Sequence, residues 1–196
     1  MISNCPHPKL RILSAEDIVG WIGNGADAMI TEALRFVLNH EPLPKQIHDA
    51  RGLFDRHYAS AIKGSQLYAG VIETLRVLAE HAFPLAVVTN KPTQFVAPLL
   101  EATGISGYFS LIVGGDDVIA KKPDPASLLL VLDNFGLPSC NLLFVGDSRN
   151  DILAAQAAGC PCAGLIYGYN FGQPIESSHP DVVLTHFNQL LPILGL

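Results

Sequence analysis

Short apolar runs alternate with amphipathic stretches along the last two thirds of the chain. Each run is bounded by Gly or polar residues, which indicates a buried strand, and apolar residues at helical spacing follow it. Strands that alternate with helices indicate βαβ units, a parallel sheet and right-handed crossovers. The pattern therefore predicts an α/β fold, a Rossmann-like parallel sheet. We expect its strands at residues 84–90, 109–115, 142–146, 162–166 and 182–184.

The first third of the chain shows helical spacing only. Ser14 and Asp17 have the spacing of a helix N-cap and its third residue, so a helix is expected to begin there. The segment 23–25, Gly-Asn-Gly, interrupts the pattern, because two glycines around an asparagine break a helix or expose backbone N–H groups. We therefore expect a small all-helical cap at residues 14–66, here only partial, and an α/β core at residues 67–196.

Composition and charge narrow the class of function. The 196 residues are 49% hydrophobic and 15% charged, which excludes disorder and supports one full domain plus a smaller one. A formal net charge of −6 without a Lys/Arg run argues against nucleic acid as a partner. No apolar run approaches membrane-spanning length, and the first residues lack a signal pattern. The four cysteines show neither a zinc spacing nor a disulfide framework, so we expect a cytoplasmic protein without a membrane partner.

Polar side chains follow three of the expected strands. Thr89 and Asn90 close one strand, Lys122 stands in a loop stiffened by prolines, and Asp147 and Asp151 flank the strand-to-helix turn that follows residues 142–146. The carboxyl ends of parallel strands are where α/β folds bind ligands. Two neighbouring carboxylates favour an oxygen-bound cation such as Mg²⁺, and a fixed ammonium can neutralise a phosphoryl group. Plainer interpretations exist: a turn for Thr89 and for Asp147, a surface loop for Lys122, and helix-dipole complementation for Asp151.

In this order, the three motifs resemble the haloacid dehalogenase-type phosphatase superfamily, and its phosphoglycolate phosphatase branch is most similar. The resemblance implies that Thr89, Asn90 and Lys122 bind the phosphoryl group. Thr89 and Lys122 would take part in catalysis, Lys122 by balancing charge on the nucleophile and the phosphate. Asp147 would ligate Mg²⁺, and Asp151 would support or complete that metal site.

The cap adds a fourth, softer match. Gly23, Asn24 and Gly25 resemble the cap loop that faces the substrate in this branch. The implied partner is a small phosphorylated metabolite, and a homodimer is left open.

One departure stands against these matches. Members of the superfamily begin with a strand that ends in Asp-x-Asp-x-Thr, whose first Asp is the nucleophile and a metal ligand. The sequence holds no such motif, and its first Asp is Asp17 in the cap. In the family that strand lies between the strands ending at Thr89 and Asp147. Without it, two strand edges lack partners, which is costly when they are buried. Residues 9–13 or another chain are the two candidates to fill the position.

The resemblance therefore implies a Mg²⁺-dependent hydrolase of a small phosphate monoester, similar to phosphoglycolate phosphatase. We expect this form to be impaired or inactive, because the attacking carboxylate is missing. A wrong start codon, truncation or gene decay would explain the loss. The alternatives are a non-catalytic protein that binds phosphate or Mg²⁺, and a phosphomutase relative, which would share Thr89, Lys122 and Asp147.

Overall fold

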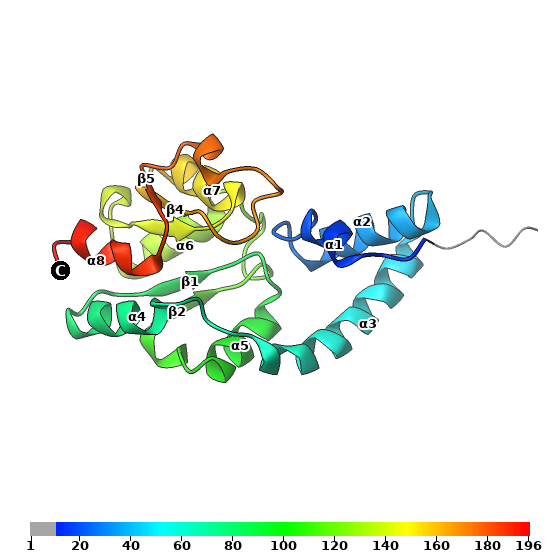
Figure 1. Cartoon of the computed structure of the whole chain (residues 1–196), viewed down its shortest axis with the longest axis horizontal. Helices are drawn as coiled ribbons and strands as arrows, with labels where there is room; N and C mark the ends of the chain where they lie inside the picture. The colour runs from blue at the N-terminus through cyan, green and yellow to red at the C-terminus, as the bar shows by residue number, and fades with distance from the viewer. Residues whose placement is uncertain (1–10) are drawn as a thin grey trace, which may run out of the picture.

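The computed structural model describes residues 11–196 of the chain (Figure 1). It contains five short strands, and every strand pairing in it is parallel. Each strand lies inside one of the segments predicted from the sequence, which confirms the α/β fold. The strands are β1 (Ala86–Val88), β2 (Leu111–Val113), β3 (Phe144–Gly146), β4 (Cys162–Leu165) and β5 (Val182–Leu184).

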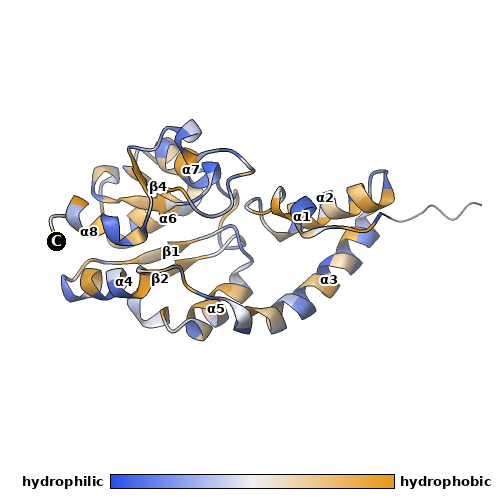
Figure 2. Ribbon diagram, viewed as in Figure 1, coloured by the Kyte–Doolittle hydropathy of each residue, from blue (hydrophilic) through white to orange (hydrophobic). Residues whose placement is uncertain are grey.

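Helices alternate with these strands. Ser148 caps the helix after β3, its side chain accepting a hydrogen bond from Asn150 N, and Gly159 ends that helix in the left-handed conformation. Figure 2 shows hydrophobic residues along β1 and β2, as expected for strands inside a layered fold. The helices of this part are α4 (Val71–Glu80), α5 (Val96–Ala102), α6 (Ala126–Phe135), α7 (Arg149–Ala158) and α8 (Leu190–Ile193), with short 3-10 turns at η2 (Thr93–Phe95), η3 (Ser106–Tyr108), η4 (Ser139–Asn141), η5 (Ile175–Ser178) and η6 (Phe187–Gln189).

The strands form two sheets rather than one. β1 pairs with β2, and β3, β4 and β5 form a second sheet, so within residues 11–196 no hydrogen-bonded ladder joins β1 to β3. Burial reflects this division. All four residues of β4, which has a neighbour on each side, are buried. All three residues of β1 are only half-buried. Within residues 11–196, β1 and β3 therefore have the unpaired edges expected from the sequence.

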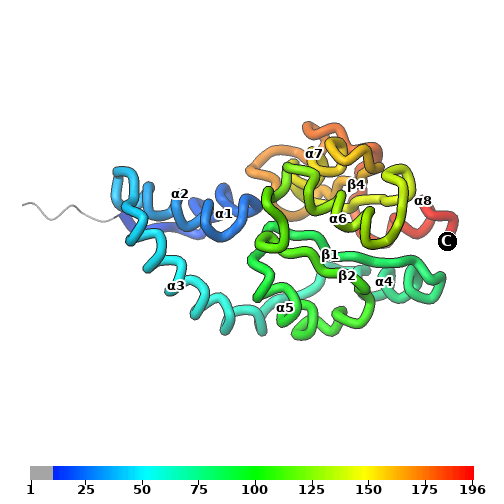
Figure 3. The backbone as a smooth tube through the Cα atoms, turned by 180° about the vertical axis from the view of Figure 1, so that it is seen from behind, coloured from blue at the N-terminus to red at the C-terminus, as the bar shows by residue number. Residues whose placement is uncertain are grey.

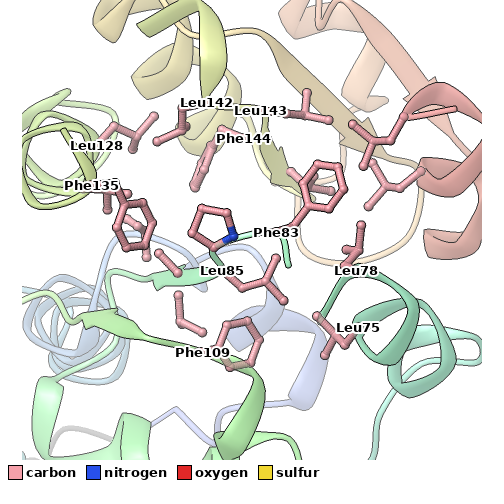
Figure 4. A pocket seen from close by; sticks show the side chains of 18 of the residues that line it. Leu75, Leu78, Phe83, Leu85, Phe109, Leu128, Phe135, Leu142, Leu143 and Phe144 are labelled. Atoms are coloured by element: carbon pink, nitrogen blue, oxygen red, sulfur yellow. The ribbon is translucent and has the colours of Figure 1, made fainter. Parts of the chain in front are cut away.

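A cavity of about 420 Å³ separates the two sheets. Residues 83–88 line one side of it and residues 141–145 line the other. We call this cavity the interstrand slot. Figure 4 shows Phe83 and Leu85 on one side, with Leu142, Leu143 and Phe144 facing them from the other. The core is thus divided at the position where a continuous sheet would have another strand.

Three helices form the N-terminal part: α1 (Ala15–Val19), α2 (Ala26–Leu38) and α3 (Pro44–Ala61), with η1 (Ile62–Gly64) after them. The predicted start of α1 is confirmed, because Ser14 and Asp17 cap it reciprocally. Figure 3 shows α3 running from the end of the molecule that holds α1 and α2 to the vicinity of α5. The division at residue 66 between a cap and a core remains a prediction. Of the helices in residues 11–196, none combines the length and apolar character needed to cross a bilayer.

The start of the described chain does not fill the interstrand slot. Residues 11–13 have no strand structure. The Arg11 guanidinium lies 5.1 Å from the centroid of the Phe36 ring, so this segment runs beside α2. The hypothesis that residues 9–13 complete the sheet is therefore wrong for residues 11–13, and residues 9 and 10 lie outside the described part.

Candidate functional site

A cleft of about 900 Å³ lies between the N-terminal helices and the carboxyl ends of β1 and β3. It brings together nearly all the residues predicted for the site, although they come from separate parts of the chain. Those that line it are Gly23, Gly25, Thr89, Asn90, Lys122, Asp147 and Asp151. Asn24 is not among the lining residues. The structure therefore brings these residues to one cleft at the ends of two strands, and their part in binding or catalysis remains a prediction.

Lys122 is a buried cation at the floor of the cleft, with 8% of its surface exposed. Its Nζ donates to Asp151 Oδ1 at 2.7 Å and to the carbonyl oxygen of Val88 at 2.8 Å. Its charge also lies 5.1 Å from the centroid of the Phe144 ring. A buried ammonium requires a paired charge and hydrogen bonds of this kind. Lys122 is therefore fixed where an anion in the cleft would meet it.

Asp151 faces Lys122 from the first turn of α7. Its second oxygen, Oδ2, accepts hydrogen bonds from the backbone N–H groups of Asp147 at 3.2 Å and Ser148 at 3.1 Å. Both oxygens thus have partners, one in the ion pair and the other in the helix cap. This arrangement makes Asp151 a positioning residue for Lys122. Its predicted part in a metal site stays a prediction.

The Asn90 side chain connects the end of β1 to two other backbone segments, the loop at Lys122 and the loop at Gly23. Its Oδ1 accepts a hydrogen bond from Lys122 N at 2.9 Å, and its Nδ2 donates to the carbonyl oxygens of Lys122 at 2.8 Å and Gly23 at 2.9 Å. Both amide hydrogens are therefore used within the protein. The side chain positions the Lys122 loop, and its predicted contact with phosphate remains untested.

Thr89 lines the cleft at the end of β1. Its backbone N–H donates to Val113 O at 2.9 Å, which continues the ladder between β1 and β2. Its Oγ1 accepts a hydrogen bond from Lys91 N at 3.1 Å. In residues 11–196 no acceptor for the hydroxyl hydrogen is found, so Thr89 can donate to an anionic oxygen.

Asp147 is the carboxylate of the site without a cationic side chain in direct contact among the described residues. Its Oδ2 accepts one long hydrogen bond, from Tyr169 N at 3.3 Å. Burial raises the pKa of the Asp147 carboxyl above its usual value, and the nearby Asp151 charge raises it further. The amides of Tyr169 and Asp147 and the Lys122 charge act in the opposite direction. A cation beside Asp147 would relieve this unfavourable environment.

These residues fit a Mg²⁺ ion bound in part by its substrate. No group of three or more His, Cys, Asp or Glu side chains suited to a metal occurs in residues 11–196. Mg²⁺ does not need such a group, since it keeps several waters and is often held by one or two carboxylates plus substrate phosphate oxygens. Asp147 offers the free carboxylate that such a site requires.

The loop at residues 23–25 closes one side of the cleft. Gly23 O accepts hydrogen bonds from Asn90, described above, and from Asn150 Nδ2 at 3.3 Å. Asn150 Nδ2 also donates to Asn24 Oδ1 at 2.8 Å. The loop predicted to face the substrate thus lies against the carboxyl ends of the strands, where two asparagine side chains hold it.

Sequence reasoning missed several residues of the cleft. Lys91 donates a hydrogen bond to the Tyr58 hydroxyl, and its Nζ lies 4.4 Å from the centroid of the Tyr58 ring. It is a second cation near Thr89, two residues along the same strand end. Because Lys91 directly follows Thr89 and Asn90 at the same strand end, the sequence could have indicated that it lines the cleft. Asn150 and Tyr169 gave no comparable signal, because their contacts to residues 23 and 24 and to Asp147 join distant segments.

The parallel α/β fold with Thr89, Lys122 and Asp147 on one cleft is the arrangement that the resemblance to a phosphatase superfamily implied. The chain belongs to the haloacid dehalogenase-like hydrolase family, whose model matches residues 5–165. It is 56% identical over 177 residues to phosphoglycolate phosphatase of Yersinia pestis, covering 90% of this chain and 76% of that protein. It is 47% identical over 205 residues to phosphoglycolate phosphatase of Escherichia coli K12, covering 96% of this chain and 81% of that protein.

A solved structure agrees with these relatives. The crystal structure of a predicted phosphoglycolate phosphatase from Haemophilus somnus 129PT matches with a TM-score of 0.90 and 39% identity. The match covers 94% of this chain and 84% of that one. The resemblance inferred from the motifs is therefore confirmed, and the chain belongs to the phosphoglycolate phosphatase-like branch of the haloacid dehalogenase-like hydrolase family.

Proposed function

We propose that this chain binds a small phosphate monoester together with Mg²⁺, and that the chain by itself turns the ester over poorly. The observation that carries the proposal is the convergence of Thr89, Lys122 and Asp147 on one cleft. A hydroxyl donor, a buried ammonium and a free carboxylate are the groups needed to hold a doubly charged anion and its counter-cation. The relatives named above make phosphoglycolate the first ester to test.

Each residue has a defined task in this proposal. The Thr89 hydroxyl donates to a phosphoryl oxygen, and Lys122 compensates negative charge on the phosphoryl group. Asp151 keeps Lys122 in place through the 2.7 Å ion pair. Asp147 would hold Mg²⁺, which when bound polarises the phosphoryl group as a Lewis acid. Positioning and electrostatic stabilisation of this kind account for most of the acceleration in phosphoryl transfer.

Poor turnover follows from the carboxylates that line the cleft. In residues 11–196 these are Asp147 and Asp151. Asp151 is occupied by Lys122 and two backbone N–H groups, and Asp147 is assigned to the cation. Neither is left to attack phosphorus. Removing the nucleophile of another hydrolase, subtilisin, costs about 2 × 10⁶ in kcat, so a loss on the order of a million-fold is expected here.

A second candidate function is a non-catalytic protein that binds phosphate or Mg²⁺. The carboxylates that line the cleft favour it too, because in the described part each of them is proposed to have a structural or cation-binding role and none is left as a nucleophile. The two candidates differ only in whether any phosphate is released.

The experiment is an assay of phosphate release by the purified 196-residue chain, with phosphoglycolate and with a chromogenic phosphate ester. Mg²⁺ is present or removed by chelation, and Asp147→Ala is the comparison variant. Slow release that needs Mg²⁺ and Asp147 supports the impaired enzyme, and ester binding without release supports the binding protein. Turnover of about 1–1,000 s⁻¹ that Asp147→Ala abolishes would contradict the proposed impairment.

A further inference from the structure

The segment that joins β4 to η5 contacts both the Asp147 carboxylate and the loop at residues 23–25. We call this segment, residues 166–174, the post-β4 loop. It leaves β4 at the same edge of the sheet as Asp147, because β3 and β4 are parallel with Gly146 paired to Gly164. Figures 1 and 3 show it reaching from that edge toward the loop before α2. Its conformation therefore affects the immediate surroundings of Asp147.

The first part of the post-β4 loop lies against the Asp147 carboxylate. Tyr169 N donates to Asp147 Oδ2 at 3.3 Å. Gly168 comes so close to this carboxylate that a Cβ at residue 168 would lie 1.8 Å from Oδ2 and 2.5 Å from Cγ. A shift of these two residues therefore changes both the packing and the hydrogen bonding of the carboxylate that is assigned to the cation.

The second part of the loop places an aromatic ring against Gly23. A Cβ at Gly23 would lie 3.2 Å from Phe171 Cζ, which is tighter than an ordinary contact. Gly23 also has a φ of 115°, a conformation that favours glycine. The Arg149 guanidinium lies 5.9 Å from the centroid of the same ring. Phe171 therefore packs against the loop at residues 23–25, beside the first residue of α7.

Phe171 has a backbone conformation that a bulky residue rarely adopts. Its φ is 52°, in the left-handed region. Such a conformation persists only where the surrounding structure requires it. Asn170 supplies part of that requirement, because its Oδ1 accepts a hydrogen bond from Arg149 N at 2.6 Å and its Nδ2 donates to Gln173 O at 2.8 Å. The packing of the ring on Gly23 supplies another part, so the turn depends on a residue outside the post-β4 loop.

We propose that Phe171 is a positioning residue, which couples the loop at residues 23–25 to Asp147. With this loop against the strand ends, Gly23 supports the Phe171 ring, and the post-β4 loop keeps the Tyr169 N–H on Asp147 Oδ2. When the loop at residues 23–25 moves away, the ring loses that support and the carboxylate loses its fixed orientation. Cation affinity at Asp147 therefore depends on the contact between Gly23 and Phe171. The cation itself rests on the proposed function, whereas the coupling of the ring to the carboxylate does not.

A double-mutant cycle on Mg²⁺ affinity tests the coupling. The affinity is measured by calorimetry on the 196-residue chain with inorganic phosphate present. Phe171→Ala removes the ring, and Gly23→Ala pushes a methyl group into it. Each change should weaken Mg²⁺ binding at least about tenfold, as changes to groups that orient a metal ligand do. The double variant should bind no more than about twofold worse than Phe171→Ala, because the ring that transmits the change is gone.

Gly25→Ala is the matched control for backbone strain and crowding. Gly25 has a φ of 90°, and a Cβ there would lie 3.2 Å from Asn90 O and 3.3 Å from Lys121 Nζ. The nearest neighbours of that Cβ thus belong to Asn90 and Lys121 rather than to Phe171. The effect of Gly25→Ala on Mg²⁺ affinity should therefore multiply with that of Phe171→Ala. If the effect of Gly23→Ala multiplies with it as well, the proposal is overturned.

Phe171→Gly distinguishes positioning from stability. It removes the ring as Phe171→Ala does, but it also relieves the left-handed backbone, so its free energy of unfolding should be the larger of the two. Its Mg²⁺ affinity should nevertheless be as low as that of Phe171→Ala. Mg²⁺ affinity that follows stability across the wild-type chain and the two variants would give Phe171 a merely structural role and overturn the proposal.

The Tyr169 amide gives a second readout that needs neither Mg²⁺ nor phosphate. A hydrogen bond to a carboxylate moves the signal of an amide proton downfield in NMR spectra. In the Mg²⁺-free chain, Phe171→Ala and Gly23→Ala should therefore move the Tyr169 signal upfield, and Gly25→Ala should not. A wild-type chain that binds no Mg²⁺ would refute the proposed function, and the Tyr169 signal would then decide the coupling. An unchanged Tyr169 signal in Phe171→Ala would overturn it.

Discussion

Asn90 and Lys122 are joined by two hydrogen bonds that run in opposite directions. The backbone N–H of Lys122 donates to Asn90 Oδ1 at 2.9 Å, and Asn90 Nδ2 donates to the Lys122 carbonyl at 2.8 Å. The side-chain amide thus pairs with the loop as a neighbouring strand would. It connects the loop that carries Lys122 to the end of β1, and its hydrogen bond to Gly23 O connects the loop at residues 23–25 to the same point.

Replacing Asn90 with Ala should therefore destabilise the fold. The change leaves the N–H and C=O of Lys122 and the C=O of Gly23 without this partner, and a buried unsatisfied group costs about 1–3 kcal/mol. We expect the free energy of unfolding to fall by roughly 2–4 kcal/mol in a urea titration. The control is Asn134→Ala, which removes one exposed hydrogen bond to Leu130 O. Equal, small losses in both variants would mean that the amide does not support the site.

The buried ion pair between Lys122 and Asp151 predicts that the two neighbouring lysines, Lys122 and Lys121, differ in their effect on stability. Lys122→Met leaves the Asp151 carboxylate buried without its cation, and breaking a buried pair in this way costs about 3–5 kcal/mol. The neighbouring Lys121 is the control, because its ion pairs are longer and more exposed. Its Nζ lies 3.8 Å from Asp116 Oδ1 and 3.9 Å from Asp27 Oδ2. Lys121→Met should change stability by about 1 kcal/mol or less.

A double variant separates the pair from its surroundings. Lys122→Met combined with Asp151→Leu removes both charges, so its cost should be smaller than the sum of the single costs. The comparison uses unfolding free energies of all four proteins. Additive losses would show that the two charges do not depend on each other.

The sequence alone predicted that Thr89, Lys122 and Asp147 would come together, because the signals that place them at strand ends are local. Apolar runs before Thr89 and Asp147 marked two strands, and Ser148 marked the start of α7. The missing first motif also predicted the break between β1 and β3. These features depend on residues within one turn or one strand of each other.

The contacts could not be predicted, because they join residues far apart in the chain. Asn90 meets partners 32 and 67 residues away, and Asp151 meets Lys122 29 residues away. A carboxylate in a first helical turn can cap the helix, bind a metal or pair with a lysine. The three-dimensional structure shows that Asp151 caps α7 and pairs with Lys122.

Gly168 gives a prediction about the cation. A Cβ at Gly168 would lie 1.8 Å from Asp147 Oδ2, whereas a Cβ at Gly172 would have no atom within 4 Å. Both glycines have positive φ, 119° and 72°, so Ala strains the backbone at each. Gly168→Ala should weaken Mg²⁺ binding, measured by calorimetry with phosphate present, by at least about tenfold. Gly172→Ala should leave it nearly unchanged. Similar losses in both would assign the effect to strain.

The central claim is that Thr89, Lys122 and Asp147 form one site for a phosphate and its cation. The most direct test is the affinity of inorganic phosphate for the purified chain, by calorimetry, with and without Mg²⁺. Mg²⁺ should tighten phosphate binding at least about tenfold, and Asp147→Asn should remove most of that gain, because the two ligands share the cleft. Phosphate that binds equally well with and without Mg²⁺, in both proteins, would contradict the account.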